Sequence, residues 1–201
     1  MLSKQSLILR LLGVMGLGFL LNACGLQSIP RAKNNVEASL AEVTNQYKRR
    51  ADLVPNLVQV VKGYASHEKE TLTAVVEARA KATQTTINPE NMTPENLNSY
   101  MQAQGSLSQA LGRLMVVVER YPDLKANQNF RDLQAQLEGT ENRITVARQR
   151  HIEAIRQFND LITVPPSSFV NAIVYRHEKL PQWNVAEEER EQIERAPTVE
   201  F

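Results

Sequence analysis

The sharpest concentration of polar side chains in the sequence surrounds Pro55, where Arg49, Arg50, Asp52 and Asn56 lie close together. A proline inside a helix has no N–H, so the carbonyl one turn earlier loses its donor and needs another one. We therefore expect Arg50 or Asn56 to donate to backbone carbonyls, or to acidic side chains of a later helix. The competing hypothesis is a notch that binds a ligand or a protein partner.

Three residues much further along the chain, Glu141, Asn142 and Arg143, complete this candidate cluster. They fall on a predicted helix whose apolar side must cover another helix, and Glu141 offers a carboxylate to the arginines. Buried charges are usually paired, which favours local hydrogen bonding and salt bridges over a binding notch.

The histidines do not assemble into a catalytic or metal-binding pattern. His67 precedes Glu68, but the zinc motif on a helix needs a second histidine one turn away, and the sequence has none there. His151 stands alone on an apolar face, where a core role is favoured. No Ser-His-Asp order, glycine-rich phosphate loop or Cys-His pair can be assembled. The sequence therefore predicts no catalytic residue, no metal and no cofactor, and a protein that is not an enzyme.

The one cysteine, Cys24, offers chemistry of a different kind. It follows the apolar stretch Leu7–Leu21 and the short link Asn22-Ala23, with Lys4 and Arg10 supplying positive charge near the start. This order is that of a signal peptide, and the junction resembles the lipobox of bacterial lipoproteins. We expect residues 1–23 to be the signal peptide and the thiol of Cys24 to carry a lipid. A plain membrane anchor with an incidental cysteine is the alternative.

Residues after the cysteine and the remaining charge bear on location and partners. Gly25 and Leu26 follow Cys24 in place of an aspartate, which by resemblance to lipoprotein sorting favours the outer membrane, facing the periplasm, in a two-membrane cell. Removing residues 1–23 leaves 21 basic against 22 acidic residues, a net charge of −1. Nucleic-acid binding needs a clear basic excess. The expected partners are therefore the membrane, through the N-terminal lipid, and an unidentified envelope protein.

The elements that position these residues follow from apolar spacing of three and four. Residues 24–35 are predicted to be a polar tether, and 36–183 the folded body. One helix is expected from about Asn34 to about Thr83, with Pro55 either kinking it or starting a new helix. A second helix starts after the capping residue Thr93 and ends near Arg120. A third runs from about Asn127 to just before Pro165.

The predicted fold is all-α: an elongated antiparallel bundle of three long helices plus a short C-terminal helix or arm. The composition supports this class, because only 5% of the residues are aromatic. Residues 184–201 are predicted to be a charged tail, either a short exposed helix or disordered.

Several motifs together resemble the LemA family. The most specific is Arg49 to Glu68, within the stretch that starts Tyr47-Lys-Arg-Arg-Ala-Asp-Leu-Val-Pro-Asn; the others are Tyr121-Pro-Asp-Leu-Lys-Ala-Asn and the final Pro-Thr-Val-Glu-Phe201. The sequence departs from the family pattern at His151-Ile152, where members commonly have Tyr-Asn, and at Val164-Pro165, where Phe-Pro is common. The resemblance implies a helical bundle and a membrane-associated bacterial setting, but it supplies no activity.

These observations favour a lipid-anchored, non-enzymatic helical scaffold or accessory protein that binds envelope partners. The rival hypothesis is a small-ligand binder or enzyme that uses the polar cluster around Pro55. A third is a lipid-interacting protein with amphipathic helices, which needs basic residues along one polar face.

Overall fold

The computed structural model describes residues 2–89 and 92–183, with side chains from Leu26 onward. The predicted charged tail and the side chain of Cys24 lie outside the described residues. Every regular element within the described part is a helix. In chain order these are α1 (Leu2–Tyr64), α2 (Lys69–Gln84), α3 (Pro94–Val118), α4 (Pro122–Ala126), α5 (Gln128–Thr163), α6 (Ser167–Val170) and the π-helix η2 (Asn171–Tyr175).

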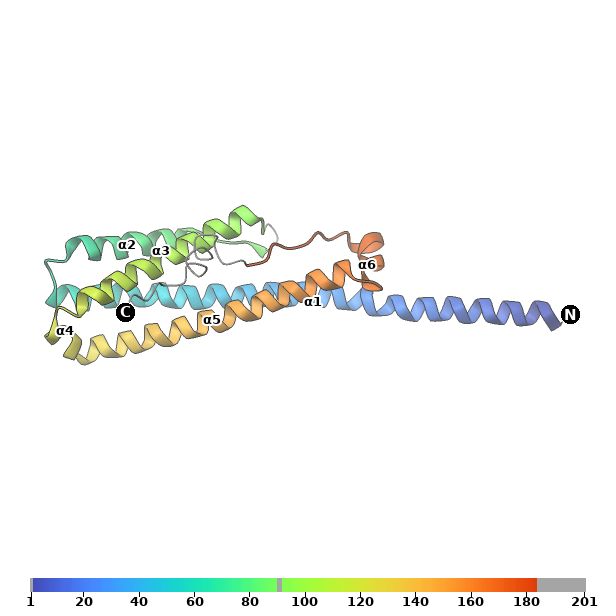
Figure 1. Ribbon diagram of the computed structural model, residues 1–201, viewed down its shortest axis with the longest axis horizontal. Coiled ribbons are helices and arrows are strands. Elements are labelled where there is room, and N and C mark those ends of the chain that lie inside the picture. Colours follow the sequence, from blue (N-terminus) through green and yellow to red (C-terminus); the bar gives the residue numbers. More distant parts are fainter. Residues whose placement is uncertain (1, 90–91, 184–201) are drawn as a thin grey trace, which may run out of the picture.

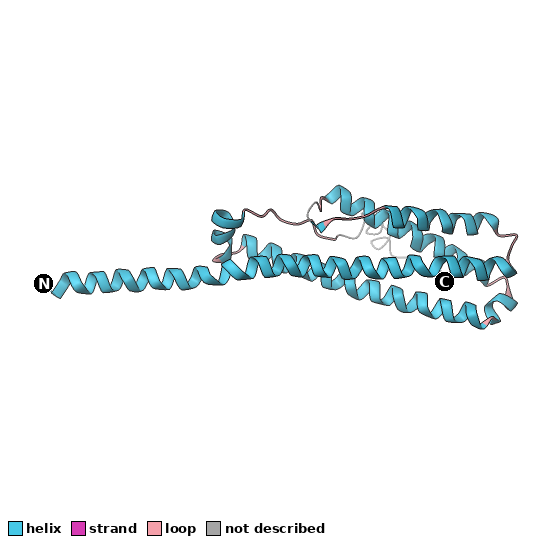
Figure 2. Ribbon diagram, turned by 180° about the vertical axis from the view of Figure 1, so that it is seen from behind, coloured by secondary structure: helices cyan, strands magenta, loops and turns pink. Residues whose placement is uncertain are grey.

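The four long helices α1, α2, α3 and α5 lie side by side, and each runs antiparallel to the one before it (Figure 1). Helix α1 packs along α5, and α2 packs against α3. The N-terminal part of α1 projects beyond the body, which Figure 2 shows from behind. The predicted all-α elongated bundle is confirmed, but it has four long helices in the described residues where three were expected.

The extra helix comes from a break that the sequence pattern did not reveal. The expected single helix to about Thr83 is wrong, because α1 ends at Tyr64 and α2 begins at Lys69 after a tight turn. Ala65 and Leu72 stand on either side of the turn, and both are buried in the same apolar cluster. The apolar spacing therefore continues through the turn, since both helices point their apolar faces at one core.

Both prolines of α1 lie inside the helix, and side chains from other helices supply the missing donors. The N–H that Pro55 lacks would have reached the carbonyl of Ala51, which accepts a hydrogen bond from Arg79 Nε at 2.8 Å. Pro30 likewise leaves the carbonyl of Leu26, which accepts from the hydroxyl of Tyr175 at 2.7 Å. Each proline is thus accommodated without ending the helix.

The expected tether over residues 24–35 is therefore wrong. This segment is part of α1, and the side chain of Ile29 is fully buried in the body. The polar composition was misleading, because a helix that buries only one side needs few apolar residues.

Local capping fixes the starts of α3 and α5 where the sequence placed them. The hydroxyl of Thr93 accepts from the backbone N–H of Asn96 at 3.2 Å, with Pro94 in the first turn of α3. The side chain of Asn127 accepts from the N–H of Phe130 at 3.0 Å at the start of α5. The short helix α4 fills the connection between them.

The C-terminal described residues form both of the expected alternatives, a short helix and then an arm. Helices α6 and η2 turn back on the body, and residues 176–183 run along it (Figure 1). Two buried asparagines hold the arm by paired hydrogen bonds: Asn171 with the backbone of His177, and Asn159 with the backbone of Leu180. The arm ends with Trp183 buried.

Two apolar clusters fill the bundle in succession along its length. One contains Ile29, Tyr47, Phe158 and Trp183, and the other contains Val54, Leu57, Leu114 and Phe130. In the part of the chain that the structure describes, no helix has the length and hydrophobicity to cross a bilayer.

Candidate functional site

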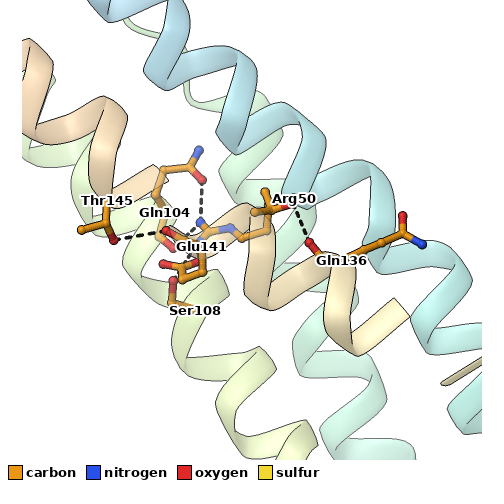
Figure 3. A network of polar contacts seen from close by, with 7 residues as sticks. Arg50, Gln104, Ser108, Gln136, Glu141 and Thr145 are labelled. Carbon is orange, nitrogen blue, oxygen red and sulfur yellow. Dashed lines mark hydrogen bonds and ion pairs between the residues drawn. The ribbon is translucent and has the colours of Figure 1, made fainter. Parts of the chain in front are cut away.

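The most deeply buried charge of the body, Arg50, lies on α1 between the two apolar clusters, and only 2% of its side chain is exposed. Its Nη1 donates to Ser108 Oγ at 2.6 Å and to Glu141 Oε2 at 3.1 Å. Its Nη2 donates to Gln104 twice, to the backbone carbonyl at 3.0 Å and to Oε1 at 2.9 Å. Figure 3 shows the guanidinium pointing at these side chains, which come from α3 and α5.

Gln104 extends this network to the remaining long helix. Its Nε2 donates to the carbonyl of Ala82 at 3.0 Å, in the last turn of α2, where helix carbonyls have no partner within the helix. Thr140 on α5 is fully buried, and its hydroxyl accepts a hydrogen bond from Nη2 of Arg143 at 3.0 Å. We call Arg50, Gln104, Ser108, Thr140 and Glu141 the polar layer. It connects all four long helices at one level.

The structure separates the predicted cluster into one buried group and several surface groups. Arg50 and Glu141 meet, whereas Arg143 donates to the neighbouring Thr140 on the same helix and makes no hydrogen bond to Arg50 or Glu141 among those of the described residues. The remaining members are exposed, namely Arg49, Asp52, Asn56 and Asn142. The expectation that Arg50 donates to backbone carbonyls and to an acidic side chain of the third predicted helix agrees with the geometry. The carbonyl freed by Pro55 is, however, bonded by Arg79 and not by Arg50 or Asn56.

Sequence reasoning missed Gln104, Ser108 and Thr140. Gln104 had a usable signal, because it stands among apolar residues on the buried face of α3. A buried amide needs partners, and a buried arginine on a neighbouring helix is a suitable one. Ser108 is an exposed residue whose hydroxyl reaches inward, and its spacing gave no indication of that role.

The chemistry available to Arg50 is limited by its bonds. Its four Nη hydrogens have four acceptors within the bundle, and its guanidinium lies 4.9 Å from the ring centre of Tyr47. Only its Nε is without a hydrogen-bond partner among the described residues. Binding an external anion at Nη would therefore require breaking an internal bond. The arrangement is that of a brace between helices.

An aromatic group lies next to the polar layer on the side of the C-terminal arm. Tyr47, Tyr100 and Trp183 form successive edge-to-face pairs, with ring centres 5.7 Å and 6.4 Å apart. Burial raises the pKa of the Tyr100 hydroxyl to about 12, so it stays protonated at neutral pH. Arg148 lies over the face of Trp183 at 5.3 Å. These contacts fasten the end of the arm to the body.

His151 takes the core position that was favoured from the sequence. Its Nδ1 lies 2.9 Å from the hydroxyl of Ser39, which donates to the carbonyl of Val36. Its ring packs edge-on against Trp183 with centres 5.8 Å apart. Burial lowers the pKa of His151 to about 4, so the ring is neutral at pH 7. The neutral imidazole is part of the packing.

His67 and Glu68 lie in the turn between α1 and α2 rather than on a helix surface. Glu68 Oε1 accepts from Arg120 at 3.0 Å and from the hydroxyl of Tyr121 at 2.9 Å. The turn is thereby joined to the end of α3, a structural role. Within residues 2–89 and 92–183, no group of three His, Cys, Asp or Glu side chains is placed to hold a metal ion.

A shallow groove of about 300 Å³ lies between α1 and α5. Glu42 and Arg150 face each other across it and form an ion pair at 3.0 Å. Both are substantially exposed, so this pair contributes little to stability. The walls of the groove also include Asn35, Glu153 and Gln157.

The fold and its polar layer together define an elongated all-α bundle, braced internally by one buried arginine. A model of the LemA family matches residues 39–201, which is most of the sequence. The chain belongs to the LemA family. That match includes Arg50 and the two helices, α3 and α5, that supply its partners.

Among curated proteins similar to the chain, one carries the name of this family and two others are magnetosome proteins. Protein LemA of Metamycoplasma hominis is 24% identical over 165 residues, covering 82% of this chain and 69% of that protein. Magnetosome protein MamQ 2 of Paramagnetospirillum magneticum is 32% identical over 72 residues, 36% of this chain and 26% of that protein. Magnetosome protein MamQ of Magnetospirillum gryphiswaldense is 30% identical over 87 residues, 40% of this chain and 32% of that protein. The chain thus spans about a third or less of the two MamQ proteins.

Proposed function

We propose that this protein is a lipid-anchored envelope protein that presents a stiff helical rod to protein partners, as a scaffold or accessory subunit. The observation that carries the proposal is the continuity of α1. The helix runs from the segment with the lipobox-like sequence into the buried core without a break. A lipid on Cys24 would therefore be joined to the body by a helix rather than by a flexible linker, and the body would keep a defined position at the membrane.

The polar layer supports a scaffold rather than a ligand site. Its donors and acceptors are used to hold four helices together, and Arg50 has no spare Nη hydrogen for a substrate. The rival function, a small-ligand binder or enzyme at the cluster around Pro55, would have to break this network first. Of the cluster, the exposed members Arg49, Asp52 and Asn56 remain available for contact with a partner.

The anchor is tested by labelling cells with radioactive palmitate and isolating the full-length protein. Cys24→Ser should abolish incorporation of the label, because the thiol is the proposed acyl acceptor. Ser28→Ala is the matched control: it changes a nearby hydroxyl and keeps the thiol, so it should label like the wild type. Equal labelling of Cys24→Ser and wild type would reject the lipid anchor. Because Gly25 and Leu26 follow Cys24 in place of an aspartate, the labelled protein should fractionate with the outer membrane of a two-membrane cell.

The scaffold role is tested by capture from detergent-solubilised envelopes with the lipidated protein as bait. Asn56 is exposed, so Asn56→Ala should leave the melting temperature within a few degrees of wild type. A loss of capture by this variant, at an unchanged melting temperature, places the partner surface beside Pro55. Binding of a small molecule that is lost in Arg50→Lys but retained in Arg49→Lys would instead favour the rival function.

A further inference from the structure

Large apolar side chains gather on the surface of the short helical stretch α6–η2. Phe169 is 60% exposed, Ile173 76% and Val174 55%, and Val164 just before the stretch is also exposed. We call these four residues the apolar foot. Phe169 and Ile173 are four positions apart, so they lie on the same side of the stretch, while Val170 turns inward to the core. Single exposed apolar residues are ordinary, but a group of this kind marks an interaction surface.

The foot lies at the end of the body from which α1 projects (Figures 1 and 2). The hydrogen bond from Tyr175 to the carbonyl of Leu26 fixes this position, because it joins the end of η2 directly to α1. Leu26 is two residues after Cys24, which is about 3 Å along a helix axis. The foot is therefore held at nearly the same level of the rod as the proposed site of lipid attachment.

We propose that the apolar foot inserts into the boundary between headgroups and acyl chains of the membrane to which Cys24 is anchored. This inference rests on the proposed lipid anchor and adds a second point of contact with the bilayer. Burial of apolar side chains at this boundary is favourable in proportion to the area removed from water. A lipid alone permits the rod to tilt freely, whereas a lipid and a foot beside it restrict the tilt.

The charges around the foot are compatible with a bilayer. Arg31 and Arg176 are exposed, and each is close in sequence to one partner of the Leu26–Tyr175 contact. Burial, and next to it the charge of Lys33, lowers the pKa of His177. Long basic side chains reach headgroups while their stems stay among apolar groups. Glu178, two residues after Arg176, is acidic and exposed and offsets part of this positive charge. Membrane contact by the foot therefore depends on its apolar residues rather than on net charge. This surface differs from a basic face along an amphipathic helix.

The bilayer is preferred over a protein as the occupant because of position. Every other surface of the rod can be far from the membrane, but this end cannot, since Cys24 and the foot are adjacent along α1. A second copy of the chain or an envelope protein covering the foot is an alternative outcome of the experiment below.

The experiment uses the full-length lipidated protein in vesicles of phosphatidylethanolamine and phosphatidylglycerol. Because lipidation consumes the thiol of Cys24, Ile173→Cys introduces the free thiol that takes an NBD fluorophore. Val116→Cys is the matched control, since Val116 is 71% exposed on α3 near its α4 end, remote from the foot (Figure 1). Nitroxide-labelled lipid should quench the fluorophore at 173 several-fold more than at 116, and its emission should be shifted to the blue. Iodide in the water should quench position 116 more strongly.

Each outcome is decisive. Strong quenching by iodide and weak quenching by lipid nitroxide at position 173 would show that the foot lies in water and overturn the proposal. Protection from both quenchers would show that a protein covers the foot, which also overturns it. Palmitate incorporation and co-sedimentation with the vesicles are measured on the same samples. If the protein incorporates palmitate but lipid nitroxide does not quench the fluorophore at position 173, the foot alone is rejected. If the protein neither incorporates palmitate nor sediments with the vesicles, the anchor is rejected as well.

Discussion

Replacement of Arg50 by methionine should destabilise the bundle strongly. The change keeps an unbranched side chain of similar length but removes four hydrogen bonds and the charge. It leaves the buried Gln104 Oε1 without its donor, which costs about 1 to 3 kcal/mol. Loss of the charge-assisted bond to Glu141 adds less than a fully buried pair would, because 53% of that carboxylate side chain is exposed. The lost bonds to the Gln104 carbonyl and to Ser108 add about 1 kcal/mol each, so we expect a total loss of about 3 to 5 kcal/mol.

Urea unfolding of the detergent-solubilised full-length protein measures this loss. With a slope of about 2 kcal/mol per molar urea, the midpoint should fall by roughly 1.5 to 2.5 M at an unchanged slope. Arg49→Met is the matched control, because Arg49 is the adjacent arginine and is exposed. Its effect should stay within about 0.5 kcal/mol.

The double variant Arg50→Met with Gln104→Leu refines the test. Removing both buried polar groups leaves no orphaned amide, so the double variant should be more stable than the sum of the single changes predicts. Equal urea midpoints for Arg50→Met and Arg49→Met would show that Arg50 is not a buried brace. A double variant that shows simple additivity would separate Gln104 from the network.

Two further predictions concern the other buried devices. Burial keeps the pKa of His151 at about 4, against 6.5 in the unfolded chain. As the pH falls, the unfolded chain therefore binds a proton first. The folded state loses stability between about pH 6.5 and 4, by on the order of 3 kcal/mol. Wild type should therefore lose more stability than His151→Gln over this interval in urea titrations, and parallel losses would contradict the assignment. Arg79→Ala should cost about 1 kcal/mol in wild type but less in the Pro55→Ala background, because alanine restores the N–H that bonds the carbonyl of Ala51. A double-mutant cycle measures the difference, and equal costs in both backgrounds would mean that Arg79 does not replace the lost donor.

Elements with local signals were predictable from the sequence. The starts of α3 and α5 depend on Thr93 and Asn127, whose side chains cap the N–H groups three residues later. Such capping requires only neighbouring residues, so the printed sequence contains all the information. The apolar spacing likewise predicted long helices, since each must bury one face.

Features that depend on distant partners were not predictable. Pro30 fits inside α1 because Tyr175 bonds the freed carbonyl of Leu26 from 149 residues away. The burial of Arg50 depends on Gln104, 54 residues away, and neither distance is visible in the periodicity. The break after Tyr64 was not predicted, because one long helix and two helices that share a core give the same apolar spacing. The contact between Arg50 and Glu141 followed from the sequence, but the partners Gln104 and Ser108 and the internal character of the network required the structure.

The pairing of the first long helix with the last has a consequence for the order in which the bundle can form. Ser39 bonds to His151, a residue that is synthesised 112 positions later. Closing so long a loop carries an entropic cost, although that cost grows only slowly with length, by about 0.6 kcal/mol for each doubling. Until α5 has emerged from the ribosome, the apolar face of α1 lacks its principal partner, although the part of α1 near Tyr64 can already pack against α2. The nascent chain therefore exposes its longest apolar stripe first, and this stripe is the surface that a chaperone would bind while the rest of the protein is being made.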